Sequence, residues 1–121
     1  MPREISNRLS LLIVDDSARM RATIRSILAQ VPLEVVGECD NGLDALKEYE
    51  RLRPDWVLMD VSMPGLDGIS ALQRIRDMDP NAKVIIVTDY ADAALKKAAA
   101  EAGAIGYVRK DDLMSVLEII G

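Results

Sequence analysis

Short apolar stretches recur along the chain and are separated by segments in which apolar residues return every three or four positions. These stretches occupy residues 9–14, 33–39, 57–59, 83–88 and 105–108, and all but the loosely alternating second one are nearly continuous apolar runs. Short runs of this kind, rich in Val, Ile and Leu, are typical of strands covered on both faces. The pattern therefore predicts five buried strands.

Each stretch is followed by an amphipathic segment that predicts a helix. In the first such segment, Met20, Ile24 and Val31 lie on one helical face, and Pro32 is expected to end the helix. The remaining helices are expected at about 43–53, 69–79, 92–102 and 112–120. Five repeats of strand and helix predict an α/β fold, with a parallel sheet between two layers of helices.

Connections between parallel strands are right-handed, which leaves few possible strand orders. Among them we expect 2-1-3-4-5, an order known for doubly wound sheets, although periodicity alone does not select it. This order places the first and third strands side by side where the winding reverses, and it opens a crevice at their carboxyl ends. The 121 residues, half of them apolar, suit one domain spanning residues 1–121.

Polar side chains occupy the carboxyl ends of four predicted strands: Asp15 and Asp16, Asp60, Thr88, and Lys110. Three neighbouring carboxylates repel one another unless a cation lies among them, and oxygen ligands at a partly hydrated site favour Mg²⁺. The sequence thus predicts a magnesium site. Asp60 can attack a phosphoryl group as a carboxylate nucleophile, with Thr88 and Lys110 holding the phosphoryl oxygens.

Taken singly, each of these residues also has a structural explanation. The sequence Asp15-Asp16-Ser17 is typical of a helix N-cap, Asp60 can begin a loop, and Lys110 can be a surface lysine. Asp67-Gly68 is expected to form a turn and a helix start. The joint placement of acidic, hydroxyl and amino groups at four strand ends favours the functional interpretation.

Composition removes several classes of function. The chain has no histidine and one cysteine, Cys39, which excludes Ser/His and Cys/His nucleophile pairs, an internal disulfide and a multi-cysteine zinc site. Cys39 is expected to be a buried filler. The net charge of −5 argues against direct nucleic-acid binding, and we expect Arg19, Arg21 and Arg25 to form a solvated helix face.

No apolar run is long enough to cross a membrane, and the N-terminal residues do not resemble a signal peptide. We therefore expect a cytoplasmic protein without a membrane partner.

Over nearly its whole length, the sequence resembles the receiver domain of bacterial two-component response regulators, whose fold is called CheY-like or flavodoxin-like. The resemblance rests on four segments: 14–17 (VDDS), 58–68 (LMDVSMPGLDG), 87–88 (VT) and 103–110 (GAIGYVRK). Segments 34–42 (EVVGECDNG) and 53–55 (RPD) further resemble the NarL-type receivers that are attached to LuxR-like DNA-binding domains.

By this resemblance, Asp60 accepts a phosphoryl group from a histidine kinase or a histidine phosphotransfer protein. Asp16, Asp60 and the main-chain carbonyl of Ser62 would bind Mg²⁺, and Asp15 would act through water. Thr88 and Lys110 would contact the phosphoryl group. The domain would catalyse only its own phosphorylation and dephosphorylation.

Thr88 and Tyr107 match the switch pair of the family. In the family the threonine moves toward the phosphate and the aromatic ring turns inward, which reshapes the surface of the fourth helix, fifth strand and fifth helix. That surface would meet a downstream protein or output domain, or a second copy in a phosphorylation-dependent homodimer. An aromatic residue on a strand can also be plain core packing, so that alternative for Tyr107 stays open.

One departure from the family pattern bears on function. Asp89 follows Thr88, where the family usually has a small residue, and its charge would disfavour the phosphate or shorten its lifetime. Ser62 and Tyr90 occupy positions that tune water access in the family.

Two other classes of function therefore stay open. Asp89 leaves open a phosphorylation-independent interaction module that retains the site. An Asp-nucleophile phosphohydrolase is disfavoured, because Asp60-Val61-Ser62 lacks the second acid–base carboxylate that such enzymes usually need.

Overall fold

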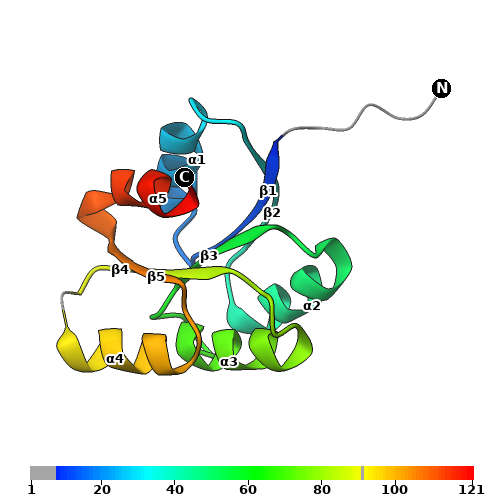
Figure 1. Cartoon of the computed structure of the whole chain (residues 1–121), viewed down its shortest axis with the longest axis vertical. Coiled ribbons are helices and arrows are strands. Elements are labelled where there is room, and N and C mark those ends of the chain that lie inside the picture. The colour runs from blue at the N-terminus through cyan, green and yellow to red at the C-terminus, as the bar shows by residue number, and fades with distance from the viewer. Residues whose placement is uncertain (1–7, 91) are drawn as a thin grey trace.

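A computed structural model describes residues 8–90 and 92–121 of the chain (Figure 1). Its five strands form one parallel sheet with the order β2-β1-β3-β4-β5. The strands are β1 (Leu9–Val14), β2 (Leu33–Cys39), β3 (Trp56–Asp60), β4 (Val84–Thr88) and β5 (Gly106–Arg109). The predicted fold class and strand order are thus confirmed.

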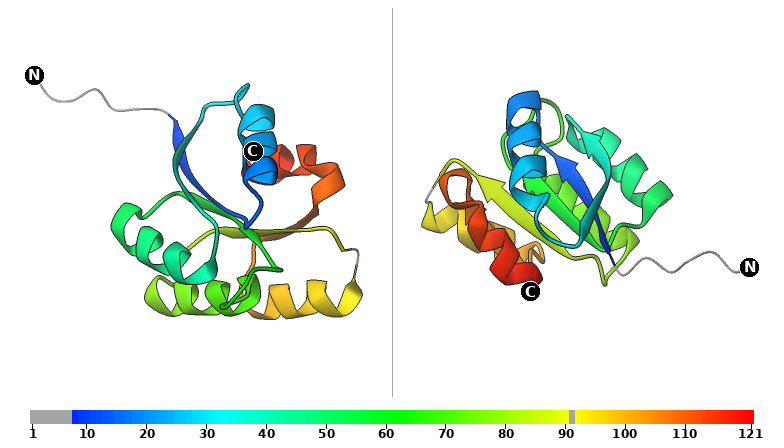
Figure 2. Two further views of the ribbon diagram at one scale, coloured as in Figure 1. Left: turned by 180° about the vertical axis from the view of Figure 1, so that it is seen from behind. Right: turned by 90° about the horizontal axis from the view of Figure 1, so that it is seen from above.

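Helices cover both faces of the sheet, as the opposite views in Figures 1 and 2 show. One face carries α1 (Ala18–Leu28) and α5 (Met114–Ile120), and the other carries α2 (Gly42–Leu52), α3 (Gly68–Met78) and α4 (Ala93–Glu101). A 3₁₀ turn, Lys110–Asp112, connects β5 to α5. None of the helices in the described part of the chain is long and apolar enough to cross a membrane.

The core is divided by the sheet into two apolar clusters. Along β1 and β3, successive side chains alternate between them, so that Leu12 and Met59 face α2 and α3 while Ile13 and Leu58 face α1 and α5. All of β3 and the part of β1 from Leu11 onward are buried, as their continuous apolar runs predicted. Cys39 is buried and unpaired, as expected.

The first helix is shorter than predicted. It ends at Leu28 instead of continuing to Pro32, and the Val31 N–H donates to the Leu28 carbonyl in a turn (3.2 Å). The ring of a proline disfavours helical backbone angles at the residue before it, which explains why Val31 is not part of the helix. The Val31 side chain still packs against the apolar cluster on the α1 face of the sheet. The apolar spacing therefore predicted correctly which side of this segment is buried, but its prediction of where the helix ends was wrong.

Candidate functional site

Asp60 is the last residue of β3, where the helices no longer cover the sheet edge, and yet its side chain is only 4% exposed. The start of α3 lies directly against it. A Cβ atom on Gly68 would lie 2.0 Å from the Asp60 carbonyl oxygen, so only glycine fits at this position. The sequence pattern marked Gly68 as a helix start but gave no sign of this close approach to Asp60.

Asp15 and Asp16 lie in the turn between β1 and α1. The Asp15 N–H donates to the Cys39 carbonyl at the end of β2 (3.0 Å), and Asp15 Oδ1 accepts from the Ser17 N–H (2.9 Å). Ser17 is the N-cap of α1, and its side chain accepts from the Met20 N–H. The N-cap interpretation is thus confirmed for Ser17, while Asp15 is 1% exposed and Asp16 is exposed.

The three aspartates converge at one point. One carboxylate oxygen each from Asp15, Asp16 and Asp60 lies within 4.8 Å of the others. Lys110 Nζ lies 2.9 Å from Asp15 Oδ2 and 3.3 Å from Asp60 Oδ1. Asp15 Oδ2 is buried and accepts no hydrogen bond, so the ion pair with Lys110 is its compensating contact.

This donor set fits a hard divalent cation. Three carboxylates and one ammonium group leave a formal charge of −2, which one divalent ion would bring to zero. All donors are oxygens, and the exposed Asp16 leaves room for the water molecules that Mg²⁺ retains in proteins. Asp15, Asp16 and Asp60 are therefore the residues that would hold such an ion.

Burial governs the electrostatics of the site. It raises the pKa of Asp60 to about 6; the charge of Asp15 adds to this rise, and Lys110 opposes it. Burial by itself would lower the pKa of Lys110, but its interactions with Asp15 and Asp60 outweigh that effect and raise it. Near neutral pH, Asp60 is therefore mainly ionised, and Lys110 carries its proton.

Thr88 lies beside Asp60 by strand register, because Asp60 pairs with Val87 on β4 and Thr88 is the next residue. Its side chain is 1% exposed, and its Oγ1 accepts from the Tyr90 N–H (3.3 Å). Thr88 in turn pairs with Arg109 on β5, which leads directly into Lys110. Parallel register thus delivers the hydroxyl and the ammonium group to the same sheet edge.

Tyr107 is half-buried on β5, and its hydroxyl donates to the Tyr90 carbonyl in the loop after β4 (2.9 Å). It therefore ties β5 to the loop that begins after Thr88. Ser62 lies exposed in the loop after β3, and Asp89 is exposed immediately after Thr88.

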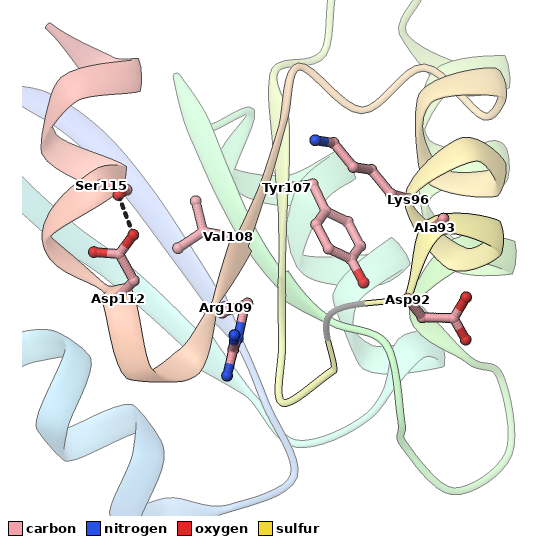
Figure 3. A pocket seen from close by; sticks show the side chains of 8 residues that line it. All are labelled: Asp92, Ala93, Lys96, Tyr107, Val108, Arg109, Asp112 and Ser115. Atoms are coloured by element: carbon pink, nitrogen blue, oxygen red, sulfur yellow. Dashed lines mark hydrogen bonds between the residues drawn. The ribbon is translucent and has the colours of Figure 1, made fainter.

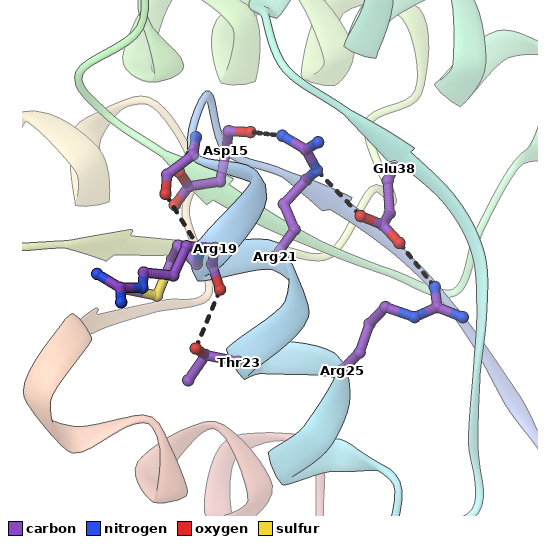
Figure 4. Close-up of polar contacts among 8 residues, drawn as sticks. Asp15, Arg19, Arg21, Thr23, Arg25 and Glu38 are labelled. Carbon is purple, nitrogen blue, oxygen red and sulfur yellow. Dashed lines mark hydrogen bonds and ion pairs between the residues drawn. The ribbon is translucent and has the colours of Figure 1, made fainter.

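The prediction of a solvated arginine face is wrong for Arg21 (Figure 4). Its side chain is only 19% exposed, with Nη1 donating to the Asp15 carbonyl (2.7 Å) and Nε donating to Glu38 Oε1 (3.0 Å). Arg19 and Arg25 are exposed, as expected, although Arg25 also pairs with Glu38 (2.9 Å). Helical spacing could not reveal that Glu38, on β2, faces α1.

A groove of about 400 Å³ lies between α4, β5 and α5, and none of Asp15, Asp16 and Asp60 lines it (Figure 3). Tyr107 and Arg109 from β5 line it, together with Lys96 from α4 and Ser115 from α5. It occupies the surface that the sequence resemblance associates with switching.

Comparison with known proteins gives consistent matches. Residues 11–120 match the family described as the response regulator receiver domain. The chemotaxis protein CheY of Thermotoga maritima is 41% identical over 100 residues, which cover 83% of each chain.

Two solved structures show the same fold. CheY in the CheX-CheY-BeF₃-Mg²⁺ complex of Borrelia burgdorferi superposes with a TM-score of 0.88 at 29% identity, covering 93% of this chain and 86% of that one. The receiver domain of the NarL response regulator of Mycobacterium tuberculosis gives 0.86 at 27% identity, covering 94% and 98%. With the acidic cluster at the expected sheet edge, these matches establish that the chain belongs to the response regulator receiver domain family of two-component signalling.

Proposed function

We propose that this receiver domain accepts a phosphoryl group on Asp60 in a Mg²⁺-dependent reaction and changes its α4-β5-α5 surface as a result. One observation carries the proposal: Asp60 ends the central strand β3 with two further aspartates around it and Lys110 Nζ 3.3 Å from its Oδ1. Phosphoryl transfer needs chiefly positioning and charge stabilisation, which this arrangement offers.

Each group has a defined part in the transfer. Asp60 supplies the attacking oxygen. The new O–P bond forms as the P–N bond to a donor phosphohistidine breaks. The histidine nitrogen keeps the electron pair of that bond and takes up a proton. Lys110 and the Thr88 hydroxyl stabilise the phosphoryl oxygens. Asp16, Asp60 and the Ser62 carbonyl would hold Mg²⁺, with Asp15 acting through water. The bound ion would supply positive charge to the developing phosphoryl negative charge.

The switch is proposed to begin at Thr88. Its hydroxyl accepts from the Tyr90 N–H, and Tyr90 in turn accepts from the Tyr107 hydroxyl. A phosphoryl group would accept the hydrogen of the Thr88 hydroxyl, and a turn of that side chain toward the phosphoryl group would break its contact with the Tyr90 N–H. The linked loop and ring would then move. A ligand shifts such an equilibrium only by its difference in affinity for the two arrangements, and a dianion beside Thr88 provides that difference.

The partners follow from this chemistry. The chain has no histidine, so the donor phosphohistidine is proposed to lie outside these 121 residues, on a histidine kinase or phosphotransfer protein. The groove beside Tyr107 is the proposed contact for a downstream protein or output domain, or for a second phosphorylated copy. The proposal places this exchange in the cytoplasm, where kinases are charged by ATP, and assigns no enzymatic activity beyond the domain's own phosphorylation and dephosphorylation.

Intact-mass spectrometry tests the proposal. The protein is incubated with Mg²⁺ and a small phosphodonor such as acetyl phosphate, with Asp60→Asn and EDTA as parallel controls. We expect one phosphoryl adduct that is absent from both controls. No adduct would support the phosphorylation-independent module, and rapid consumption of donor without a lasting adduct would support the hydrolase.

A further inference from the structure

The guanidinium of Arg21 joins α1 to two other parts of the fold (Figure 4). It donates from Nη1 to the Asp15 carbonyl (2.7 Å) and from Nε to Glu38 Oε1 on β2 (3.0 Å). We propose that Arg21, held in place by Glu38, is a positioning residue for the Mg²⁺ site, acting through the peptide group between Asp15 and Asp16. The inference rests on the proposed function and adds a residue to the site.

The backbone of Asp15 is fixed at two points. Its N–H is fixed by the Cys39 carbonyl (3.0 Å), and its carbonyl is fixed by Arg21. A peptide group is planar, so fixing the carbonyl of Asp15 also fixes the N–H and the Cα of Asp16. The direction in which the Asp16 side chain leaves the turn therefore depends on Arg21.

Asp16 needs this support more than its neighbours do. The carboxylate of Asp15 is buried and held by the Ser17 N–H and Lys110, whereas Asp16 is exposed on the solvent side of the cluster. Its carboxylate must nevertheless lie within 4.8 Å of those of Asp15 and Asp60 to share a cation. Groups behind the ligands commonly set this kind of orientation, and their removal weakens metal binding.

Glu38 gives the arginine its fixed position. Its two carboxylate oxygens accept separately from Arg21 and Arg25, so α1 is clamped to β2 at two points. The planar guanidinium meets a carboxylate through Nε and a carbonyl through Nη1, and the single nitrogen of a lysine does not reproduce this fixed two-nitrogen geometry.

Loss of the Arg21 charge and loss of its positioning contact are expected to change the Mg²⁺ affinity in opposite directions, so a titration can distinguish the two effects. Removing a positive charge near a cation site should, by charge alone, leave Mg²⁺ affinity unchanged or raise it. Loss of the Asp15 carbonyl contact should lower it. Arg25→Met is the matched control, because Arg25 binds the same Glu38 from the same helix and does not donate to Asp15 in the described contacts.

The experiment is a Mg²⁺ titration by isothermal calorimetry of the wild type, Arg21→Met and Arg25→Met. We expect Arg21→Met to lower Mg²⁺ affinity by about tenfold and Arg25→Met to leave it unchanged. The backbone ¹³C resonance of the Asp15 carbonyl, recorded without Mg²⁺, should shift in Arg21→Met only. The phosphorylation rate of Arg21→Met should approach that of the wild type at saturating Mg²⁺.

Unchanged affinity in Arg21→Met would overturn the inference, as would an equal loss in Arg25→Met. If Arg21→Met does not fold, Glu38→Ala is titrated instead, and unchanged affinity there counts against the inference in the same way. Absence of saturable Mg²⁺ binding in the wild type would be a failure of the proposed function. The carbonyl resonance would still show whether Arg21 holds Asp15 in solution.

Discussion

Asp60→Asn should stabilise the metal-free protein at neutral pH, because the carboxylate is buried beside another one. Asp60 is 4% exposed, and burial together with Asp15 raises its pKa from 3.8 to about 6. A rise of roughly two pK units corresponds to about 3 kcal/mol of free energy opposing ionisation in the folded state. Asparagine has nearly the same shape and carries no charge, so it removes this cost.

The sign of the pH dependence follows from the same pKa. The folded-state pKa of Asp60 lies above the unfolded value, so the unfolded chain loses its proton first as the pH rises. As the pH rises from about 4 to about 6, Asp60 therefore progressively lowers the free energy of unfolding. Above about pH 6 this destabilisation is complete. The advantage of Asp60→Asn should be about 2–3 kcal/mol at pH 7 and should vanish near pH 4.

Urea unfolding in EDTA measures this directly, since the single tryptophan, Trp56, is buried at the start of β3 and reports unfolding by its fluorescence. Asp77→Asn, which removes the same charge from an exposed position on α3, is the control and should have little effect. Adding Mg²⁺ should reverse the ranking, because ligand binding stabilises only the chain that retains the site. Equal stability of wild type and Asp60→Asn at pH 7 in EDTA would show that ionised Asp60 does not destabilise the folded protein.

Three further predictions concern the surroundings of the site. Lys110→Met leaves both buried carboxylates without their cation and should lower the free energy of unfolding in urea by about 3 kcal/mol at pH 7. The loss should be smaller at pH 5, where Asp60 takes up a proton, and a loss that does not change with pH would contradict this. Gly68→Ala places a methyl group 2.0 Å from a carbonyl oxygen and should lower thermal stability more than Gly65→Ala. The methyl of Gly65→Ala meets no atom within 4 Å, so its cost is limited to the backbone strain of a positive φ (77°), about 1–2 kcal/mol. Tyr107→Phe removes the hydroxyl contact to the Tyr90 carbonyl (2.9 Å) and should lower the free energy of unfolding by about 1 kcal/mol. It should also speed amide hydrogen exchange in the loop after β4, and unchanged exchange would show that the contact does not hold this loop.

The sequence was sufficient where the signal was local or repeated. Continuous apolar runs identified the buried strands, and the position of Asp60 at the end of one of them led to the site. The parallel register of β3 and β4 then places Thr88 near Asp60, because Asp60 pairs with Val87.

The sequence was not sufficient where the signal depended on distances across the fold. Gly68 reads as an ordinary helix start until its approach to the Asp60 carbonyl is known. Arg21 reads as a solvated residue because its two partners, Asp15 and Glu38, lie on segments that helical spacing cannot relate to it. The boundary of α1 was missed for a local reason, since the effect of Pro32 extends to the residue before it.

Asp60 is proposed to receive a phosphoryl group with Mg²⁺ held among the three aspartates. A crystal structure of the protein grown with Mg²⁺ and beryllofluoride, a mimic of the phosphoryl group, is the decisive test. We expect beryllofluoride on an Asp60 carboxylate oxygen, Mg²⁺ bound by Asp16, Asp60 and the Ser62 carbonyl, and Lys110 and Thr88 in contact with the fluorides. Beryllofluoride absent from Asp60 at saturating concentration, or Mg²⁺ bound away from this cluster, would contradict it.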